Sequence, residues 1–169
     1  MMSLEDKAIL VAQRVHADQT YEIFPYIYHV LSVRDLAKKL GYDKVIVVAS
    51  ILHDVLEDSF LSYSALKRHF GLEIAEICFA LWDEKGRNRK EKHEKTYPAI
   101  RESWKATVVK VLDRVVNKKT SEEFNPSKAK MYRKEHSFFV ESLTNSKHPK
   151  DVNKAWDLLE EIMKEANAS

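Results

Sequence analysis

The sequence contains little glycine, proline and cysteine, and each shortage excludes a class of protein. Its three glycines, Gly41, Gly71 and Gly86, stand far apart, so the chain has neither a glycine-rich phosphate loop nor a dinucleotide-binding fingerprint. With four prolines, the same scarcity argues against a β-sandwich or barrel, because those folds need many tight turns. The single cysteine, Cys78, excludes an internal disulfide framework and a cysteine-based zinc site.

Long apolar segments and targeting signals are also missing. The longest apolar stretch covers residues 45–52 and is too short to span a bilayer. No basic segment precedes an apolar run at the N-terminus, so we expect no signal peptide. We therefore expect a cytoplasmic protein without a membrane partner, in which Cys78 is a buried packing residue.

Positive charge is concentrated in the middle of the chain, although the net formal charge is only +2. Residues 85–119 contain 12 basic and 4 acidic side chains. Such a block is typical either of a wall that binds polyphosphate or of a solvated helical surface. A nucleic-acid groove is a third interpretation, but residues 87–95 have no aromatic side chains that could stack on bases. We therefore do not expect a nucleic-acid partner.

Apolar residues recur with helical spacing along most of the chain, and no segment alternates with the period of two that is typical of a strand. We predict one all-α domain over residues 1–169, with eight or nine helices. Its core covers about residues 4–120, and C-terminal helices cover about 126–166. The predicted helices are residues 4–16, 27–40, 44–56, 63–71, 72–82, 91–102, 106–118, 126–143 and 152–165.

Cap residues set several of these boundaries. Gly41 is expected in the left-handed conformation that often ends a helix. Asp43 is expected to cap the third helix, Ser62 or Ser64 the fourth, and Asp151 the last.

Residues 53–58, HDVLED, place four titratable side chains at the end of the most apolar predicted helix. If that helix continues, His53 and Glu57 share one face, and Asp54 and Asp58 share the next. Three carboxylates directly after an apolar helix are costly unless a cation or water compensates them, and a divalent metal is the simplest compensation. The alternative is an ordinary helix end that enters a polar loop.

Two further polar residues stand on apolar helix faces. His29 is either a core histidine or a ligand. Asp113 needs a partner, which is either a metal or a base such as Lys110 or Arg114. Asn117, one turn later, can add a hydrogen bond to Asp113. Four other histidines stand in charged or loop-like contexts, and we expect them at the surface: His69, His93, His136 and His148.

Two histidines and two aspartates would together form a mixed nitrogen and oxygen site, which suits manganese, iron or zinc. These four residues are His29, His53, Asp54 and Asp113. An ion in such a site lowers the pKa of water and orients its attack on phosphorus. Glu57 and Asp58, within a turn of two of the ligands, would position that water or move protons.

The order of these residues resembles that of the HD-domain metallophosphohydrolases. The resemblance is closer still to the hydrolase domain of the RelA/SpoT-type alarmone enzymes and to the small alarmone hydrolases. It extends from about residue 16 to residue 120, through the segments PYIYHV, LHDVLED, LSYSALKRHFGLEIAEICFALWDEK and VVKVLDRVVNKKT. The resemblance implies an HD-type helical domain that removes the 3′-diphosphate of guanosine 3′,5′-bis(diphosphate). The products are pyrophosphate and GDP, or GTP from the pentaphosphate.

The resemblance also implies residue roles. The two histidines and two aspartates match the ligands of one divalent ion, usually manganese, with iron, zinc, cobalt or nickel as alternatives. Glu57 and Asp58 match an acidic pair that supports water activation. Asn117 matches an asparagine near the ribose, Tyr26 a tyrosine beside the nucleotide, and Thr120 a threonine that contacts phosphate. The expected partner is a small phosphorylated nucleotide.

One part of the family pattern is absent. The family has an Arg-Lys pair before PYI, whereas residues 19–25, QTYEIFP, contain no basic side chain. We hypothesise that Lys85, Arg87, Arg89 or Lys90 supplies the missing phosphate contacts. Two other functions stay open, namely an HD nucleotidase or phosphodiesterase with another small phosphorylated substrate, and a non-catalytic nucleotide-binding module. The sequence leaves the oligomeric state open.

Overall fold

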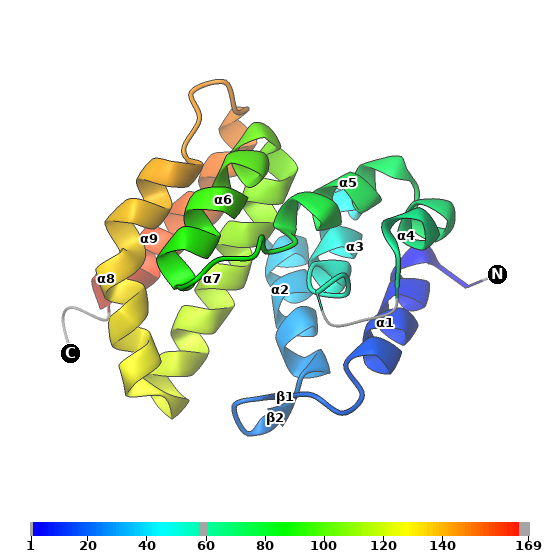
Figure 1. Cartoon of the computed structure of the whole chain (residues 1–169), viewed down its shortest axis with the longest axis horizontal. Coiled ribbons are helices and arrows are strands. Elements are labelled where there is room, and N and C mark those ends of the chain that lie inside the picture. Colours follow the sequence, from blue (N-terminus) through cyan, green and yellow to red (C-terminus); the bar gives the residue numbers. More distant parts are fainter. Residues whose placement is uncertain (1, 58–60, 166–169) are drawn as a thin grey trace.

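The computed structural model describes residues 2–57 and 61–165, and these are almost entirely helical (Figure 1). The chain begins with α1 (Leu4–Val15), β1 (Thr20–Tyr21), β2 (Phe24–Pro25), α2 (Ile27–Lys39) and α3 (Lys44–Leu52). It continues with α4 (Tyr63–Phe70), α5 (Leu72–Leu81), α6 (Arg89–Glu102) and α7 (Trp104–Phe124). The last elements are α8 (Pro126–Leu143), a 3₁₀ turn (Lys150–Val152) and α9 (Asn153–Glu165). The predicted all-α fold is confirmed, with nine α-helices in the described residues.

The helices α3 and α7 form the centre of the fold. All side chains of residues 46–52 in α3 are buried, as expected for a helix that is apolar on every side. One hydrophobic cluster joins α7 to α2, α3, α5, α6, α8 and α9, and a second joins α3 to α1, α4 and α5. Figure 1 shows α1 and α4 at one end of the molecule and α8 and α9 at the other. No helix in the described part of the chain is long and apolar enough to cross a bilayer.

The pair formed by α2 and α3 sets the position of the site. Gly41, with a φ of 73°, ends α2 in the left-handed region, as predicted. Asp43 caps α3, since its carboxylate accepts the N–H of Ile46 at 2.9 Å. The connection is so short that the helices pack antiparallel. His29 and His53 lie about a dozen residues before and after this turn, and an equal rise in both helices brings them level.

The predicted end of the third helix is wrong. The helix α3 ends at Leu52, and residues 53–57 form tight turns. The His53 Nδ1–H donates to the carbonyl of Ser50 at 2.8 Å, and two backbone N–H groups in the turns bond to carbonyls three residues earlier. The helix face that His53 and Glu57 were expected to share therefore does not form. Asp58 lies outside the described residues.

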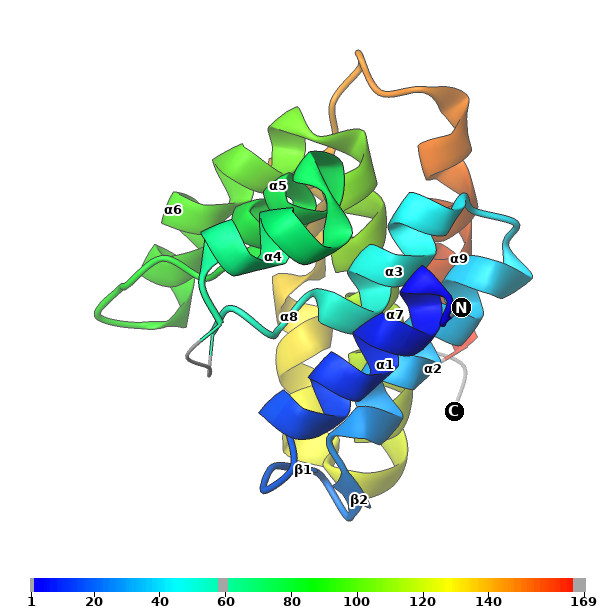
Figure 2. The same ribbon diagram turned by 90° about the vertical axis from the view of Figure 1, so that its right-hand side faces the viewer.

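A small hairpin precedes α2 and was not predicted. Tyr21 pairs with Phe24 across a turn in which Glu22 has a φ of 53°. Strands of two residues are too short to produce an alternating pattern, so the sequence contains no signal for them. Figure 2 shows this hairpin at one end of α2, close to α1.

Three later helix boundaries also differ from the prediction. The helix α6 begins at Arg89 rather than residue 91, because Asn88 caps it. Ser103 caps α7, which extends over Trp104–Phe124 rather than 106–118. Asp151 does not cap α9, because it lies inside a 3₁₀ turn that precedes that helix.

Burial confirms one prediction and corrects another. Cys78 is fully buried with a free thiol, as expected. His93, expected at the surface, is only 5% exposed and stacks on Tyr97 with ring centroids 4.6 Å apart. Burial, followed by the positive charge of Arg89, lowers the pKa of His93 to about 4. The charged residues next to His93 in the sequence lie on the same helix, but the His93 side chain itself is buried.

Candidate metal centre

Three elements bring the four predicted ligands together. His29 lies in the first turn of α2, His53 and Asp54 follow α3 directly, and Asp113 lies in the middle of α7. The Nε2 atoms of the two histidines are 3.3 Å apart. Asp113 Oδ1 is 3.1 Å from His29 Nε2 and 3.7 Å from His53 Nε2. The predicted convergence is confirmed, and His29, His53 and Asp113 form a possible metal site.

Asp54 is the fourth member of this group. Its Oδ2 atom lies 2.9 Å from His53 Nε2 and 3.8 Å from His29 Nε2. The same oxygen accepts a hydrogen bond from the hydroxyl of Tyr26 at 2.6 Å. Tyr26 therefore lies beside the centre and orients one of its carboxylates.

The donor set fits a divalent metal ion. Around an ion with bonds of about 2.1 Å, neighbouring ligand atoms lie about 3.0–3.4 Å apart. The distances from the two histidine Nε2 atoms to the oxygens of Asp54 and Asp113 are 2.9 to 3.8 Å. Two buried imidazole nitrogens that face each other also require a proton or a cation between them. His53 Nδ1 donates to a backbone carbonyl, and this leaves its Nε2 lone pair free for a metal.

The charges of these residues stabilise one another. Burial disfavours the charged form of His53, but Asp54 and Asp113 outweigh this effect and raise its pKa well above the usual value. Burial alone would raise the pKa of Asp113, yet Lys110 and the two histidines hold it well below the usual value. The pKa of Asp54 is also lowered, because His53 outweighs its burial. A divalent ion would replace the proton on His53 and keep both carboxylates charged.

Asp113 is held by side chains on both of its oxygens. Asn117 Nδ2 donates to Oδ1 at 2.6 Å, which confirms the predicted hydrogen bond. The Lys110 ammonium lies 3.5 Å from Oδ2. Tyr21 donates its hydroxyl to Asn117 Oδ1 at 3.1 Å, and its ring centroid lies 4.5 Å from that of His29. Sequence reasoning did not single out Tyr21, whose hydrogen-bond partner lies 96 residues away.

Glu57 lies beside the centre. Its carboxylate accepts the backbone N–H of Asp83 at 3.2 Å. Loss of hydration, followed by the negative charges of Asp54 and Asp83, raises the pKa of Glu57 to about 7. Such a group can take up and release a proton near neutral pH.

The predicted nucleotide contacts Asn117 and Thr120 lie on α7, next to Tyr21. Both ends of the Asn117 amide are used, because Oδ1 accepts from Tyr21 and Nδ2 donates to Asp113. Burial raises the pKa of the Tyr21 hydroxyl, and the Thr120 side chain acts against this effect. In this structure these residues connect the hairpin to the metal centre.

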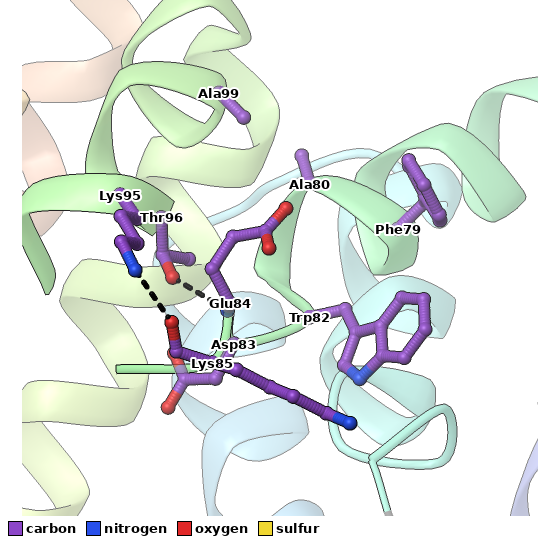
Figure 3. A pocket seen from close by; sticks show the side chains of 9 residues that line it. All are labelled: Phe79, Ala80, Trp82, Asp83, Glu84, Lys85, Lys95, Thr96 and Ala99. Atoms are coloured by element: carbon purple, nitrogen blue, oxygen red, sulfur yellow. Dashed lines mark hydrogen bonds between the residues drawn. The ribbon is translucent and has the colours of Figure 1, made fainter. Parts of the chain in front are cut away.

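Lys85 lines a pocket of about 320 Å³ between α5 and α6. Figure 3 shows its side chain extending beside the indole of Trp82, which is half exposed. Asp83 also lines this pocket, and its backbone N–H bonds to Glu57. Asp83 therefore links a wall of this pocket to Glu57.

The two predicted arginines have carboxylate partners elsewhere. Arg87 pairs with Glu91 at 2.9 Å, and its side chain is 90% exposed. Arg89 pairs with Glu135 of α8 at 2.7 Å. Among the residues that the structure describes, no hydrogen bond or ion pair joins either guanidinium to the four ligands. The structure therefore gives no support to their role as phosphate contacts.

Curated proteins with related sequences match most of this chain. The chain is 27% identical over 147 residues to a probable guanosine-3′,5′-bis(diphosphate) 3′-pyrophosphohydrolase of Synechocystis, which covers 82% of this chain and 19% of that protein. It is 30% identical over 134 residues to the guanosine-3′,5′-bis(diphosphate) 3′-pyrophosphohydrolase of Aquifex aeolicus, which covers 76% and 19%. The chain thus spans about a fifth of the length of these relatives.

The fold and a family model agree with these similarities. A solved structure, described as a metazoan ortholog of SpoT that hydrolyses ppGpp, matches with a TM-score of 0.79 at 20% identity. That match covers 98% of this chain and 97% of the other, so the two share a fold. The family model for the HD domain matches residues 8–137, which include all four converging side chains. The chain therefore belongs to the HD domain family.

Proposed function

We propose that this chain is a manganese-dependent phosphohydrolase that removes the 3′-diphosphate of guanosine 3′,5′-bis(diphosphate). The observation that carries the proposal is the convergence of two histidines and two aspartates beside Glu57, whose pKa is about 7. The activities named for the two curated relatives support the substrate. The mixed nitrogen and oxygen donors support manganese, although iron, zinc, cobalt or nickel would also suit them.

Different residues of the chain have different roles in the proposed hydrolysis. A divalent ion in this centre would supply Lewis acidity to the phosphoryl group and to water. A water oxygen forms a bond to the 3′-phosphorus, the bond between that phosphorus and the ribose oxygen breaks, and GDP and pyrophosphate leave. Glu57 accepts the proton of the water and passes it to the departing ribose 3′ oxygen, which becomes the 3′-hydroxyl of GDP, and we propose Asp58 as its assistant. Tyr26 and Asn117 hold the two carboxylates in place.

A second candidate function is hydrolysis of another small phosphorylated substrate. It is favoured by the hairpin, where residues 19–25 offer a nucleotide no positive charge. Two side chains of this segment already have partners within the protein, because the ring of Tyr21 packs on His29 and Glu22 pairs with Lys128 at 3.3 Å. A non-catalytic nucleotide-binding module is the third candidate, and the basic block of residues 85–119 is its only support.

A substrate panel separates these candidates. The manganese-loaded protein is assayed on guanosine 3′,5′-bis(diphosphate), on guanosine 3′-monophosphate and on bis(p-nitrophenyl) phosphate, with Asp54→Ala as the inactive control. We expect the highest kcat/KM for the bis(diphosphate), with GDP and pyrophosphate in equal amounts. A higher kcat/KM for the monoester or the diester would favour the second candidate. Tight metal binding without turnover of any substrate would favour the third.

We further propose a small phosphorylated nucleotide as the natural partner and the cytoplasm as the location. The free, buried thiol of Cys78 is compatible with a reducing compartment. Neither a membrane nor a nucleic acid is part of this proposal.

A further inference from the structure

Negative charge is concentrated in and beside the metal centre. Four carboxyl groups lie there, two in the centre and two at its edge: Asp54, Asp113, Glu57 and Asp83. A diphosphate also carries several negative charges, and one divalent ion does not neutralise all of them. A substrate of this class therefore needs a further cation within reach of the ion.

The ammonium group of Lys110 is a cation that lies beside the metal centre. It lies on α7 one turn before Asp113, and its ammonium is 3.5 Å from Asp113 Oδ2. The other oxygen, Oδ1, contacts His29 and Asn117, so the ammonium and the histidines approach different oxygens of one carboxylate. Burial alone would lower the pKa of Lys110, but the negative charges of Asp113 and Asp83 outweigh this effect and raise the pKa above its usual value.

The Lys110 ammonium can bind a further anion. Its distance of 3.5 Å from Asp113 exceeds that of a good hydrogen bond, so this ion pair does not use up its three N–H donors. Its side chain is 19% exposed, which leaves access from solvent while limiting the screening of its charge. An ammonium also imposes no fixed geometry on a phosphate, unlike a guanidinium.

Three other basic side chains in the described residues already have carboxylate partners. Lys92 forms an ion pair with Asp83 at 2.8 Å. Arg87 and Arg89 pair with glutamates at 2.9 and 2.7 Å, as described above. Lys110 differs from these three side chains because its partner, Asp113, belongs to the metal centre.

We propose that the Lys110 ammonium and the metal centre together form a binding site for a diphosphate, with Lys110 contacting a phosphoryl oxygen. The proposal rests on the proposed function for the identity of the substrate. The site itself would also accept inorganic pyrophosphate, which allows a test without turnover.

The test is binding of inorganic pyrophosphate to the manganese-loaded protein, measured by calorimetry at pH 8. Lys110→Met removes the charge and keeps most of the aliphatic stem, and Lys110→Arg keeps the charge. Lys105→Met is the matched control, since Lys105 lies on the same helix, is 15% exposed and pairs with Asp43 and Glu73 instead. We expect Lys110→Met to weaken pyrophosphate binding about 10- to 100-fold, the loss of one charge-assisted contact. Lys110→Arg should restore most of the affinity, and Lys105→Met should bind like wild type.

Manganese affinity is measured for each variant as a second readout. The proposal requires that Lys110→Met bind manganese within about threefold of wild type. It is overturned if Lys110→Met binds pyrophosphate as tightly as wild type, or if the wild type does not bind pyrophosphate. Loss of manganese in Lys110→Met also overturns it, because Lys110 would then act only by positioning Asp113. A wild type that binds pyrophosphate through Lys110 but does not hydrolyse the guanosine bis(diphosphate) would keep this site and reject the proposed substrate.

Discussion

At the scale of single residues, the centre depends on carboxylates whose oxygens have defined partners. Asp113 directs Oδ1 to His29 and Asn117 and Oδ2 to Lys110. Asp54 directs Oδ2 to both His53 and Tyr26. Asn117 and Tyr26 each fix a carboxylate oxygen that a metal would need, so removal of either side chain should weaken metal binding or turnover more than folding.

Glu57→Gln tests the proposed proton acceptor. The variant should bind manganese like wild type and lower kcat about 10²- to 10⁴-fold, the usual contribution of general base catalysis. For wild type, kcat/KM should rise with pH, because only ionised Glu57 accepts a proton. The apparent pKa of this rise should be about 7 or lower, because a bound cation favours the ionised carboxylate of Glu57. A pH profile unchanged by the substitution would exclude Glu57 as the base, and loss of manganese would make it a ligand.

Tyr21→Phe tests the link between the hairpin and the centre. It removes the hydrogen bond to Asn117 Oδ1 and leaves the ring against His29. Denaturant unfolding should show a loss of about 1 kcal/mol, and manganese affinity should fall about 3- to 10-fold as Asn117 loosens. Tyr28→Phe is the control, because Tyr28 is 46% exposed. Equal manganese affinities for the two variants would show that the link does not position Asp113.

At the scale of elements, local signals predicted the helices better than their ends. Asp43 and Ser62 cap α3 and α4 as the sequence indicated, because an N-cap acts over only three residues. The end of α3 was missed, since His53 bonds to the Ser50 carbonyl and competes with the helical pattern. Likewise, the convergence of two histidines and two aspartates could be predicted from their types and order. Tyr21 could not, because its contacts depend on distant segments.

Gly41→Ala tests the connection that brings α2 and α3 level. A side chain at a φ of 73° costs about 1–2 kcal/mol, although an added Cβ would meet no atom within 4 Å. Urea unfolding should therefore show a loss of this size, while manganese affinity in the folded protein stays unchanged. Lys39→Ala, at an exposed position of α2, should change stability by less than about 0.5 kcal/mol. A Gly41→Ala variant as stable as the control would contradict this account of the turn.

At the scale of the whole molecule, a charged cluster joins α6 and α8 to α7, the helix that carries Asp113. Glu135 of α8 contacts Arg89 of α6 at 2.7 Å and Arg114 of α7 at 3.4 Å. Arg114 is only 5% exposed and lies over the ring of Phe139, with 4.2 Å between guanidinium and centroid. The basic block is thus partly neutralised by α8, which its sequence alone did not reveal.

Glu135→Gln removes this negative charge and retains the side chain's shape. Two guanidinium groups, one of them buried, lose their partner, so the free energy of unfolding should fall by about 1–3 kcal/mol. Glu141→Gln is the control, because Glu141 lies on the same helix and is exposed. If denaturant curves for the two variants coincide, the cluster does not hold α6, α7 and α8 together.

The most direct test of the central claim is the anomalous scattering of a crystal soaked in manganese. The account predicts one strong peak, with bonds of about 2.0–2.3 Å to nitrogen and oxygen atoms of four side chains. These four are His29, His53, Asp54 and Asp113. The peak should be absent from the same crystal form of Asp54→Ala. A wild-type crystal with its manganese bound elsewhere, or with no peak among these residues, would contradict the claim that they form the metal centre of a hydrolase.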